Sequence, residues 1–337
     1  MTHPSDLPVD RTGMFGMALT FLSSRALYVA AELGLADHVA DGPRTTEELA
    51  RATGTHEPTL YRLLRLLAGV GVFTETAPRT FGTTPLANAL RTDLSGSLRP
   101  FVLHTLGTQY QAWGELGHTV RTGQEAFSKA MGMPVWQYHA EHPEVNSLLN
   151  QVMSRESEAM TEELLTGHDF GPYRTVADIG GGQGALLTGI LARHPDSRGI
   201  LFDQPHVVSH ELLDKAGVAE RAEVVGGDFF ASVPGGADLY VLKWIIHDWP
   251  DDKATEILAN VRAAMAPGAT LALVEYVIPP GNEPAHSKTL DLVMLVLNEG
   301  RERTREQFEA LLGAAGFRLD RVTAMPSGVS LLEATPV

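Results

Sequence analysis

The chain has 337 residues, of which 44% are hydrophobic and 20% charged; this composition is typical of globular proteins, and the length favours two domains. A formal net charge of −15 disfavours non-specific binding to nucleic acids or anionic membranes, because those polyanions would be repelled over most of the surface. The absence of cysteine excludes disulfides, thiolate metal ligands and a cysteine nucleophile.

The N-terminal stretch MTHPSDLPVDRTG contains no basic region followed by an apolar core. No uninterrupted apolar run in the chain reaches the length that spans a bilayer. We therefore expect a cytoplasmic protein without a membrane segment.

Apolar residues at three- and four-residue spacing predict helices from Gly13 to about Met160. Thr45 or Thr46 can cap a short helix, a second amphipathic helix follows, and residues 71–85 have the pattern of a β-wing. That order predicts a winged helix, which raises the alternative of a ligand-sensing, DNA-binding regulator. Residues 44–99 hold seven arginines against five acidic residues, and the second helix is mostly apolar, so we expect its apolar face to be buried rather than to read DNA.

Beyond Gly167 the pattern changes to short apolar runs, largely β-branched, that helical segments separate. This alternation predicts a mostly parallel sheet with crossover helices, and the tail predicts two further strands joined by a tight turn. We expect three segments: residues 1–100, a helical linker at 101–170 and an α/β domain at 171–337. The predicted strands are residues 175–180, 198–203, 222–230, 237–244, 270–276, 318–325 and 329–337.

The stretch VADIGGGQGAL places glycines directly after a predicted buried strand and before a helix, where the backbone can turn sharply and a ligand can approach closely. Gly180, Gly182 and Ala185 also satisfy the G-x-G-x-x-A pattern of dinucleotide sites, so a nicotinamide oxidoreductase stays open as an alternative. A plain turn would explain the glycines as well.

Acidic residues at the next strand ends favour a nucleoside ligand. Asp203 ends the second strand, where a carboxylate can accept hydrogen bonds from both ribose hydroxyls. Asp228 and Phe229 end the third strand, where a carboxylate suits the adenine amine and a ring can stack on the base. Asp178, just before the first glycine, could face a ligand ammonium group.

Together these stretches carry a family resemblance. The second half resembles a class I S-adenosylmethionine-dependent methyltransferase, and the chain from about Gly13 resembles the plant and bacterial O-methyltransferases that include the caffeate, acetylserotonin and polyketide enzymes. The fold this implies is a seven-stranded, mostly parallel sheet with an antiparallel last strand, preceded by a helical winged-helix dimerisation domain. The matching stretches are VADIGGGQG, FDQPHVV, GDFF, LKWIIHDW, LVEYVIP and GRERT.

The resemblance implies S-adenosyl-L-methionine as the cofactor and assigns the residues that bind it. The glycine loop would hold the methionine portion, the FDQPHV motif the ribose, and the GDFF motif the adenine. Lys243 and, more loosely, Ser157 would also contact the cofactor. The complete set of cofactor candidates is Asp178, Gly180, Gly182, Asp203, Gln204, Asp228, Phe229, Lys243 and Ser157.

Methyl transfer to a phenol needs a base, because a hydroxyl with a pKa of about 10 is mostly protonated at neutral pH. His247, between two tryptophans in LKWIIHDWPDD, fits that need, although a lone histidine among apolar residues is more often a core side chain. The resemblance supplies Glu275 and Glu302 as the carboxylates that flank this base, and Asp248 could orient the acceptor. Read alone, Glu302 in GRERT is most simply a solvated surface charge.

The acceptor is expected to be a small, phenolic, aromatic molecule, such as a secondary metabolite. Some bacterial relatives use the cofactor for other chemistry, but the retained base and glutamates favour methyl transfer. The thirteen histidines are scattered and no HExxH motif occurs, so the sequence predicts no metal site. The resemblance also implies a homodimer, for which helices at 13–40 are candidates. Acceptor-pocket candidates are Phe127, Trp136, Met153, Trp244, Met294 and Asn298.

Overall fold

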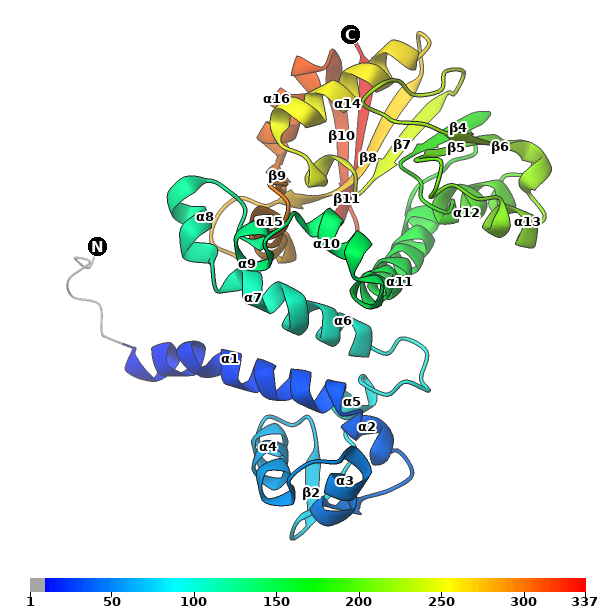
Figure 1. The fold of residues 1–337 in the computed structure, drawn as a ribbon. Coiled ribbons are helices and arrows are strands. Elements are labelled where there is room, and N and C mark those ends of the chain that lie inside the picture. Colours follow the sequence, from blue (N-terminus) through cyan, green and yellow to red (C-terminus); the bar gives the residue numbers. More distant parts are fainter. Residues whose placement is uncertain (1–9) are drawn as a thin grey trace. The chain divides into compact units, whose positions relative to one another are not determined.

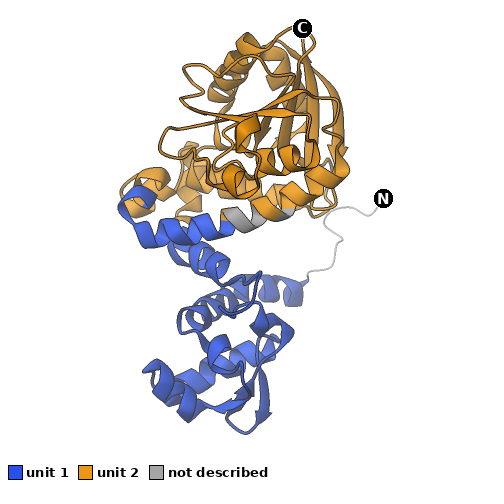
Figure 2. Ribbon diagram, turned by 90° about the vertical axis from the view of Figure 1, so that its right-hand side faces the viewer, with its two compact units in different colours: residues 1–111, 139–152 blue, residues 112–138, 153–337 orange. Residues whose placement is uncertain are grey.

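A computed structural model describes residues 10–337, except the side chains at 154–156 and 159 (Figure 1). Part of the N-terminal stretch examined for a targeting signal thus lies outside the described residues. The chain forms two compact units, one of residues 1–111 with 139–152 and one of residues 112–138 with 153–337 (Figure 2). The predicted linker at 101–170 contributes to both units, and the three-segment division stays a prediction.

The first unit contains the predicted winged helix. Helix α3 (Thr46–Thr53) begins with a capping box in which Thr45 and Glu48 satisfy each other's backbone groups. Helix α4 (Glu57–Gly69) follows, and the wing consists of β2 (Thr74–Ala77) and β3 (Thr80–Gly82), with β1 (Arg44–Thr45) paired to β3.

The second helix of this motif buries its apolar face, as predicted. Leu60, Leu64 and Leu67 of α4 are at most 4% exposed and pack in the core of the unit. The remaining helices are α1 (Arg11–Glu32), α2 (Leu35–His38), α5 (Pro85–Asn88), α6 (Arg99–His104), a π-helical turn (Thr105–Gln109), α7 (Tyr110–Trp113) and α10 (Val135–Glu141). Helix α7 ends in the other unit, and α10 begins there.

Helix α1 is long and apolar enough to cross a membrane by length and composition alone. A single such helix near the N-terminus is weak evidence for a membrane span. Its first three turns expose a run of large apolar side chains: Met14, Phe15, Met17, Leu19, Phe21 and Leu22.

The second unit is built on a sheet with the strand order β10-β11-β8-β7-β4-β5-β6. Neighbouring strands from β6 to β8 are parallel, whereas the last strand in the chain, β11, runs antiparallel to both of its neighbours. This confirms the predicted sheet. The strands are β4 (Thr175–Ile179), β5 (Arg198–Asp203), β6 (Ala222–Gly226), β7 (Leu239–Lys243), β8 (Thr270–Ile278), β10 (Phe317–Ala324) and β11 (Val329–Pro336), with the short β9 (Arg303–Thr304) paired to β8.

Helices cover both faces of this sheet (Figure 1). On one face α14 (Asp251–Ala264) and α16 (Arg305–Ala314) bury apolar side chains against β7 and β8. On the other face α11 (Pro143–Gly167), α12 (Ala185–Arg193) and α13 (Glu211–Lys215) do the same. The other helical segments are α8 (Leu116–Thr122), α9 (Phe127–Met131), α15 (His286–Leu297) and two 3₁₀ turns, Ala219–Arg221 and Ile246–Asp248.

Candidate active site

The histidine of LKWIIHDWPDD lies on a turn that follows β7 directly. Lys243 ends the strand, and Trp244 then adopts a left-handed backbone with φ of 56°. The Trp244 N–H still donates to the carbonyl of Val274 in β8 at 3.0 Å, so the chain leaves the sheet only after this residue. The 3₁₀ turn Ile246–Asp248 then carries His247 at the carboxyl edge of the sheet.

His247 lies among three carboxylates. Its Nδ1 is 2.8 Å from Glu302 Oε1 and 4.0 Å from Glu275 Oε2, while its Nε2 is 3.7 Å from Asp248 Oδ1. His247, Glu275 and Glu302 are all buried. The structure therefore brings together the catalytic set that the resemblance implied, and Glu302 is not the solvated charge that its arginine-rich surroundings suggest.

Backbone and amide groups hold these carboxylates in place. Glu275 Oε1 accepts hydrogen bonds from the N–H groups of Ile245 at 3.2 Å and Ile246 at 2.8 Å. Asn298 Nδ2 donates to Asp248 Oδ1 at 3.1 Å. The second oxygens of Glu275 and Glu302 are buried and have no hydrogen-bond partner among the described residues. Unpaired buried carboxylate oxygens of this kind disfavour the charged form.

The cluster shifts the protonation of its members. Burial by itself lowers the pKa of His247, but Asp248, Glu275 and Glu302 outweigh this effect and raise that pKa to about 10. Burial raises the pKa of Glu275 and of Asp248, and the nearby imidazolium opposes both shifts. The three carboxylates therefore favour the protonated form of the imidazole in the unliganded protein.

The same three side chains could also hold a metal ion, because the ligand atoms of His247, Glu275 and Glu302 lie within 4.8 Å of one another. Two of these groups are already bonded to each other, through Nδ1 and Glu302 Oε1 at 2.8 Å. A metal ion would have to replace that hydrogen bond, so the arrangement fits an oriented imidazole better than a metal centre.

The glycine loop after β4 leaves space beside a buried carboxylate. Gly180 has φ of 71°, and a Cβ there would lie 2.5 Å from Ile245 Cδ1. Gly182 has φ of 61° and nothing within 4 Å of the position of a Cβ. Asp178 is 1% exposed, its Oδ2 has no partner among the described residues, and burial raises its pKa to about 6. An open backbone next to an unpaired acid fits a ligand that carries an ammonium group.

The acids at the next two strand ends also bind their own loops. Asp203 accepts from the N–H of Gly182 at 2.8 Å and from that of Gln204 at 2.7 Å, so it fixes the glycine loop across the sheet edge. Asp228 Oδ1 accepts from the N–H of Phe230 at 2.9 Å. Each carboxylate has further lone pairs with which it can accept from a ligand hydroxyl or amine.

Aromatic rings gather beside the third strand end. The Phe229 ring meets the Trp249 ring edge to face, with centroids 6.0 Å apart, and the Phe230 ring lies 4.7 Å from that of Trp249. The sequence motif GDFF indicated Phe229. That motif did not indicate that Trp249, two residues after His247, would pack against these phenylalanines.

Lys243 lies between the loop acids and α11. Its Nζ donates to Ser157 Oγ and lies 5.1 Å from the centroid of the Trp244 ring. Burial lowers the pKa of Lys243, and Asp178 opposes that shift. Asp178, Asp203, Asp228 and Lys243 thus lie at or beside the carboxyl ends of β4, β5, β6 and β7, the edge where open α/β sheets bind ligands.

The acceptor-pocket candidates are more scattered. Asn298 and Met294 are half-buried at the end of α15, where Asn298 contacts Asp248. Phe127 is fully buried and packs against Tyr138, with ring centroids 5.5 Å apart. Trp136 and Met153 are exposed, by 56% and 40%.

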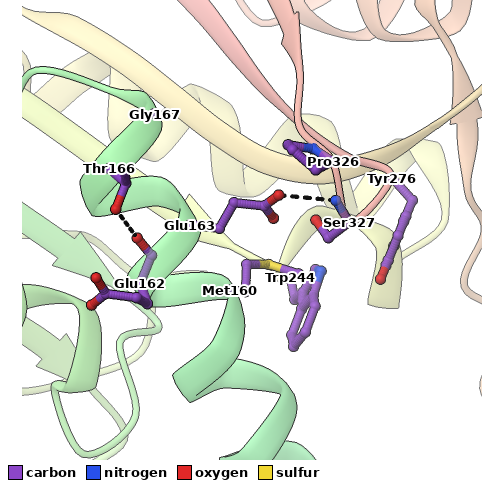
Figure 3. Close-up of a pocket in the computed structure, with 9 residues that line it drawn as sticks. All are labelled: Met160, Glu162, Glu163, Thr166, Gly167, Trp244, Tyr276, Pro326 and Ser327. Atoms are coloured by element: carbon purple, nitrogen blue, oxygen red, sulfur yellow. Dashed lines mark hydrogen bonds between the residues drawn. The ribbon is translucent and has the colours of Figure 1, made fainter.

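Trp244 lines a cavity of about 700 Å³ together with residues of α11, β8 and the turn between β10 and β11 (Figure 3). Its ring is nearly parallel to that of Tyr276, with centroids 6.3 Å apart. Successive residues of a strand point to opposite faces, so Tyr276 and the preceding Glu275 lie on opposite faces of the sheet. The side chain of Trp244 therefore faces away from the carboxylates around His247. The lining residues are Met160, Glu162, Glu163, Thr166, Gly167, Trp244, Tyr276, Pro326 and Ser327.

Comparison with known proteins places this geometry among methyl-transferring enzymes. Residues 113–318 match the O-methyltransferase domain, and residues 15–93 match the O-methyltransferase dimerisation domain. The phenazine O-methyltransferase PhzM of Lysobacter antibioticus is 46% identical over 316 residues, which cover 93% of each chain.

Solved structures agree. The mitomycin 7-O-methyltransferase MmcR superposes with a TM-score of 0.89 at 36% identity and covers 97% of each chain. The O-methyltransferase NcsB1 from neocarzinostatin biosynthesis, solved with S-adenosylmethionine and 2-hydroxy-5-methyl naphthoic acid, superposes with a TM-score of 0.83 at 33% identity, covering 93% of this chain and 96% of its own. None of these matches supports a DNA-binding regulator.

Proposed function

The chain belongs to the family of S-adenosylmethionine-dependent O-methyltransferases, and from this premise we propose that His247 is the base that takes the proton from an acceptor hydroxyl. The observation that carries this proposal is the hydrogen bond between His247 Nδ1 and the buried Glu302 at 2.8 Å. It fixes the orientation of the ring and leaves Nε2 as the nitrogen that can accept a proton.

S-adenosylmethionine, when bound, supplies a methyl group that is already activated by the positive charge on sulfur. The protein has then to position the acceptor and remove its proton. Glu302 and Glu275 stabilise the imidazolium that forms when Nε2 takes that proton, because both lie within 4.0 Å of Nδ1. Asp248, held by Asn298, lies on the Nε2 side, where it can accept from a second polar group of the acceptor.

The residues that we propose for the cofactor are those around the glycine loop. Asp178 would pair with its ammonium group, and the loop of Gly180 and Gly182 would bind its methionine portion, with open space at Gly182. Asp203 and Gln204 would bind the ribose, and Asp228 and Phe229 the adenine. Lys243 and Ser157 would bind its carboxylate, since they already contact each other at this edge.

The relatives indicate an aromatic acceptor, and we propose a phenol. Asn298 is the pocket candidate that bonds a residue beside the base, because it donates to Asp248, and Met294 lies one helical turn before it in α15. Phe127, Trp136 and Met153 stay as predictions for the rest of the pocket, whereas the Trp244 side chain faces away from the carboxylates around His247 and is not proposed for it. We further propose that the protein works in the cytoplasm as a homodimer joined through α1.

The first experiment measures methyl transfer and the role of His247 together. The purified protein is incubated with S-adenosylmethionine and a panel of phenols, and release of S-adenosylhomocysteine is followed. We expect His247→Ala to lower kcat about a hundredfold or more, because a positioned base contributes on that order.

Two controls make this result specific. His56→Ala, which changes an exposed histidine of the winged helix, should leave kcat unchanged. In calorimetry, His247→Ala and the parent protein should bind S-adenosylmethionine with the same affinity. Full turnover by His247→Ala would remove this residue from the mechanism.

A further inference from the structure

The segment at residues 298–303 wraps closely around the turn that carries His247. The Arg301 N–H donates to the His247 carbonyl at 2.8 Å, and Asn298 and Glu302 bond the side chains of Asp248 and His247. At Gly300 a Cβ would lie 2.4 Å from the His247 carbonyl oxygen, so only glycine allows this approach. The base is thus held by backbone and side-chain contacts from one short segment.

Arg303, the last residue of that segment, holds both ends of the turn. It is 1% exposed and is among the largest fully buried side chains of the described chain. Its Nη1 donates to the Ile246 carbonyl at 3.0 Å and its Nη2 to the Trp249 carbonyl at 2.9 Å. These carbonyls immediately flank the pair His247 and Asp248.

The same guanidinium also makes a two-pronged contact with the first residue of α14. Nε and Nη2 lie 2.9 Å and 2.8 Å from Asp251 Oδ1. A buried charge is strongly unfavourable unless it is paired and hydrogen-bonded, and here a carboxylate and the backbone carbonyls of Ile246, Trp249 and Arg301 satisfy it. Arg303 is therefore connected to the turn through several bonds that depend on one another.

We propose that Arg303 is a positioning residue: it fixes the turn at residues 246–249 so that the His247 ring stays bonded to Glu302 with Nε2 directed to the acceptor. This inference rests on the proposed function, because it assumes that His247 is the base. Arg303 acts through Asp251 and through the backbone carbonyls of the turn. Its proposed role does not require a contact with the imidazole.

The test replaces Arg303 by lysine, which keeps the charge but lacks the planar fork. We expect Arg303→Lys to lower kcat about tenfold or more while KM for S-adenosylmethionine stays within about twofold, since a small displacement of a base affects the chemical step more than remote binding. Arg305→Lys is the matched control, because Arg305 is exposed and pairs with Glu309 on the surface of α16. Equal kcat values for the two variants would overturn the proposal.

The pH profile separates positioning from a general loss of stability. Three carboxylates face His247 and raise its pKa, namely Asp248, Glu275 and Glu302. If the imidazole moves away from Glu302, the pKa of His247 falls, because one of these negative charges is then more distant. The limb on which kcat/KM rises with pH should therefore move to lower pH in Arg303→Lys. A fall in kcat without any movement of that limb would contradict a role through His247.

A double-variant cycle tests the route directly. If Arg303 acts through His247, Arg303→Lys should have little further effect on kcat in the His247→Ala background. If the kcat losses of the two single variants instead multiplied in the double variant, Arg303 would not act through His247. Full activity of His247→Ala would refute the base itself, whereas a large loss in His247→Ala beside an unaffected Arg303→Lys would refute the positioning alone.

Asp251→Ala provides a second probe should Arg303→Lys not fold. Asp251 has a side chain that is 58% exposed, so water can occupy the space that its carboxylate leaves, and the carbonyls of Ile246 and Trp249 still accept from the guanidinium. We expect kcat to fall about three- to tenfold, with the same movement of the pH limb, because the fork loses its anchor. An unchanged kcat in a folded Asp251→Ala protein would overturn the proposal.

Discussion

His247 has more negative charge around it than one imidazolium can neutralise. Three carboxylates lie within 4.0 Å of its ring nitrogens, and two of them are fully buried. The surroundings therefore favour the imidazolium over the neutral ring, which is the product of proton transfer rather than its starting state. An acceptor proton moves more readily to a nitrogen whose charged form is stabilised, but the neutral ring must first be available.

This charge balance predicts how pH and Glu302 act on the rate. The pKa of His247 is raised to about 10, so the neutral base becomes more abundant, and kcat/KM rises, as pH increases through the neutral range. Glu302→Gln removes one negative charge and should move this rising limb to lower pH by about 1–3 units. It should also lower the plateau, because the remaining base is weaker. The measurement is kcat/KM from pH 6 to about 11, which includes the approach to the plateau above a pKa of about 10.

Glu309→Gln, an exposed change on α16, is the control and should leave the profile unchanged. A Glu302→Gln profile that moved to higher pH would show that Glu302 does not stabilise the imidazolium.

Asp178 shows a conflict between stability and ligand binding. Its carboxyl is buried, its folded pKa of about 6 lies above the ordinary 3.8, and one oxygen has no partner among the described residues. A raised carboxyl pKa means that the folded state is penalised as the group ionises. The penalty is absent below the ordinary pKa and is complete above about pH 6.

Asp178→Asn should therefore stabilise the unliganded protein at pH 8 by up to about 3 kcal/mol and have little effect at pH 4. It should also weaken S-adenosylmethionine binding about tenfold or more, because the ammonium group loses its partner. Chemical denaturation at both pH values and calorimetry measure the two effects. Asp214→Asn, at an exposed position of α13, should change neither property. A destabilised Asp178→Asn at pH 8 would contradict the argument.

At the scale of elements, the strands were predictable because a strand buried on both faces of a sheet is a nearly continuous apolar run in the sequence. Residues 198–203 and 270–276 are apolar runs without alternation, and they form β5 and most of β8 in parallel pairing. The threonine cap of α3 was equally predictable, because the capping box of Thr45 and Glu48 depends only on the three-residue spacing between them.

Other features of the site depend on contacts between distant segments and left no local signal. Arg303 lies 57 residues from Ile246 in the chain, and nothing in the sequence around it distinguishes it from the exposed Arg305 that follows Thr304. The left-handed backbone of Trp244, which redirects the chain toward His247, occurs at a bulky residue that local preferences would place in a strand. The family resemblance supplied Glu302; its surroundings in the sequence suggested a surface charge.

At the scale of the whole molecule, helix α1 exposes large apolar side chains to water. Met14, Phe15 and Met17 are 67%, 69% and 72% exposed within one chain. Contiguous apolar surface of this kind marks an interaction site in water, and this helix lies in the region that matches a dimerisation domain. In a homodimer the same surface can be buried on both subunits.

We therefore expect Phe15→Glu combined with Met17→Glu to convert a dimer to monomers, because each carboxylate would have to be buried without a partner at the interface. Size-exclusion chromatography with light scattering measures the mass across a range of concentrations. Val120→Glu is the matched control, since Val120 is 73% exposed on α8 and lies outside the dimerisation match. A double variant that remained dimeric would place the interface elsewhere, whereas monomers with normal cofactor binding would assign α1 to assembly.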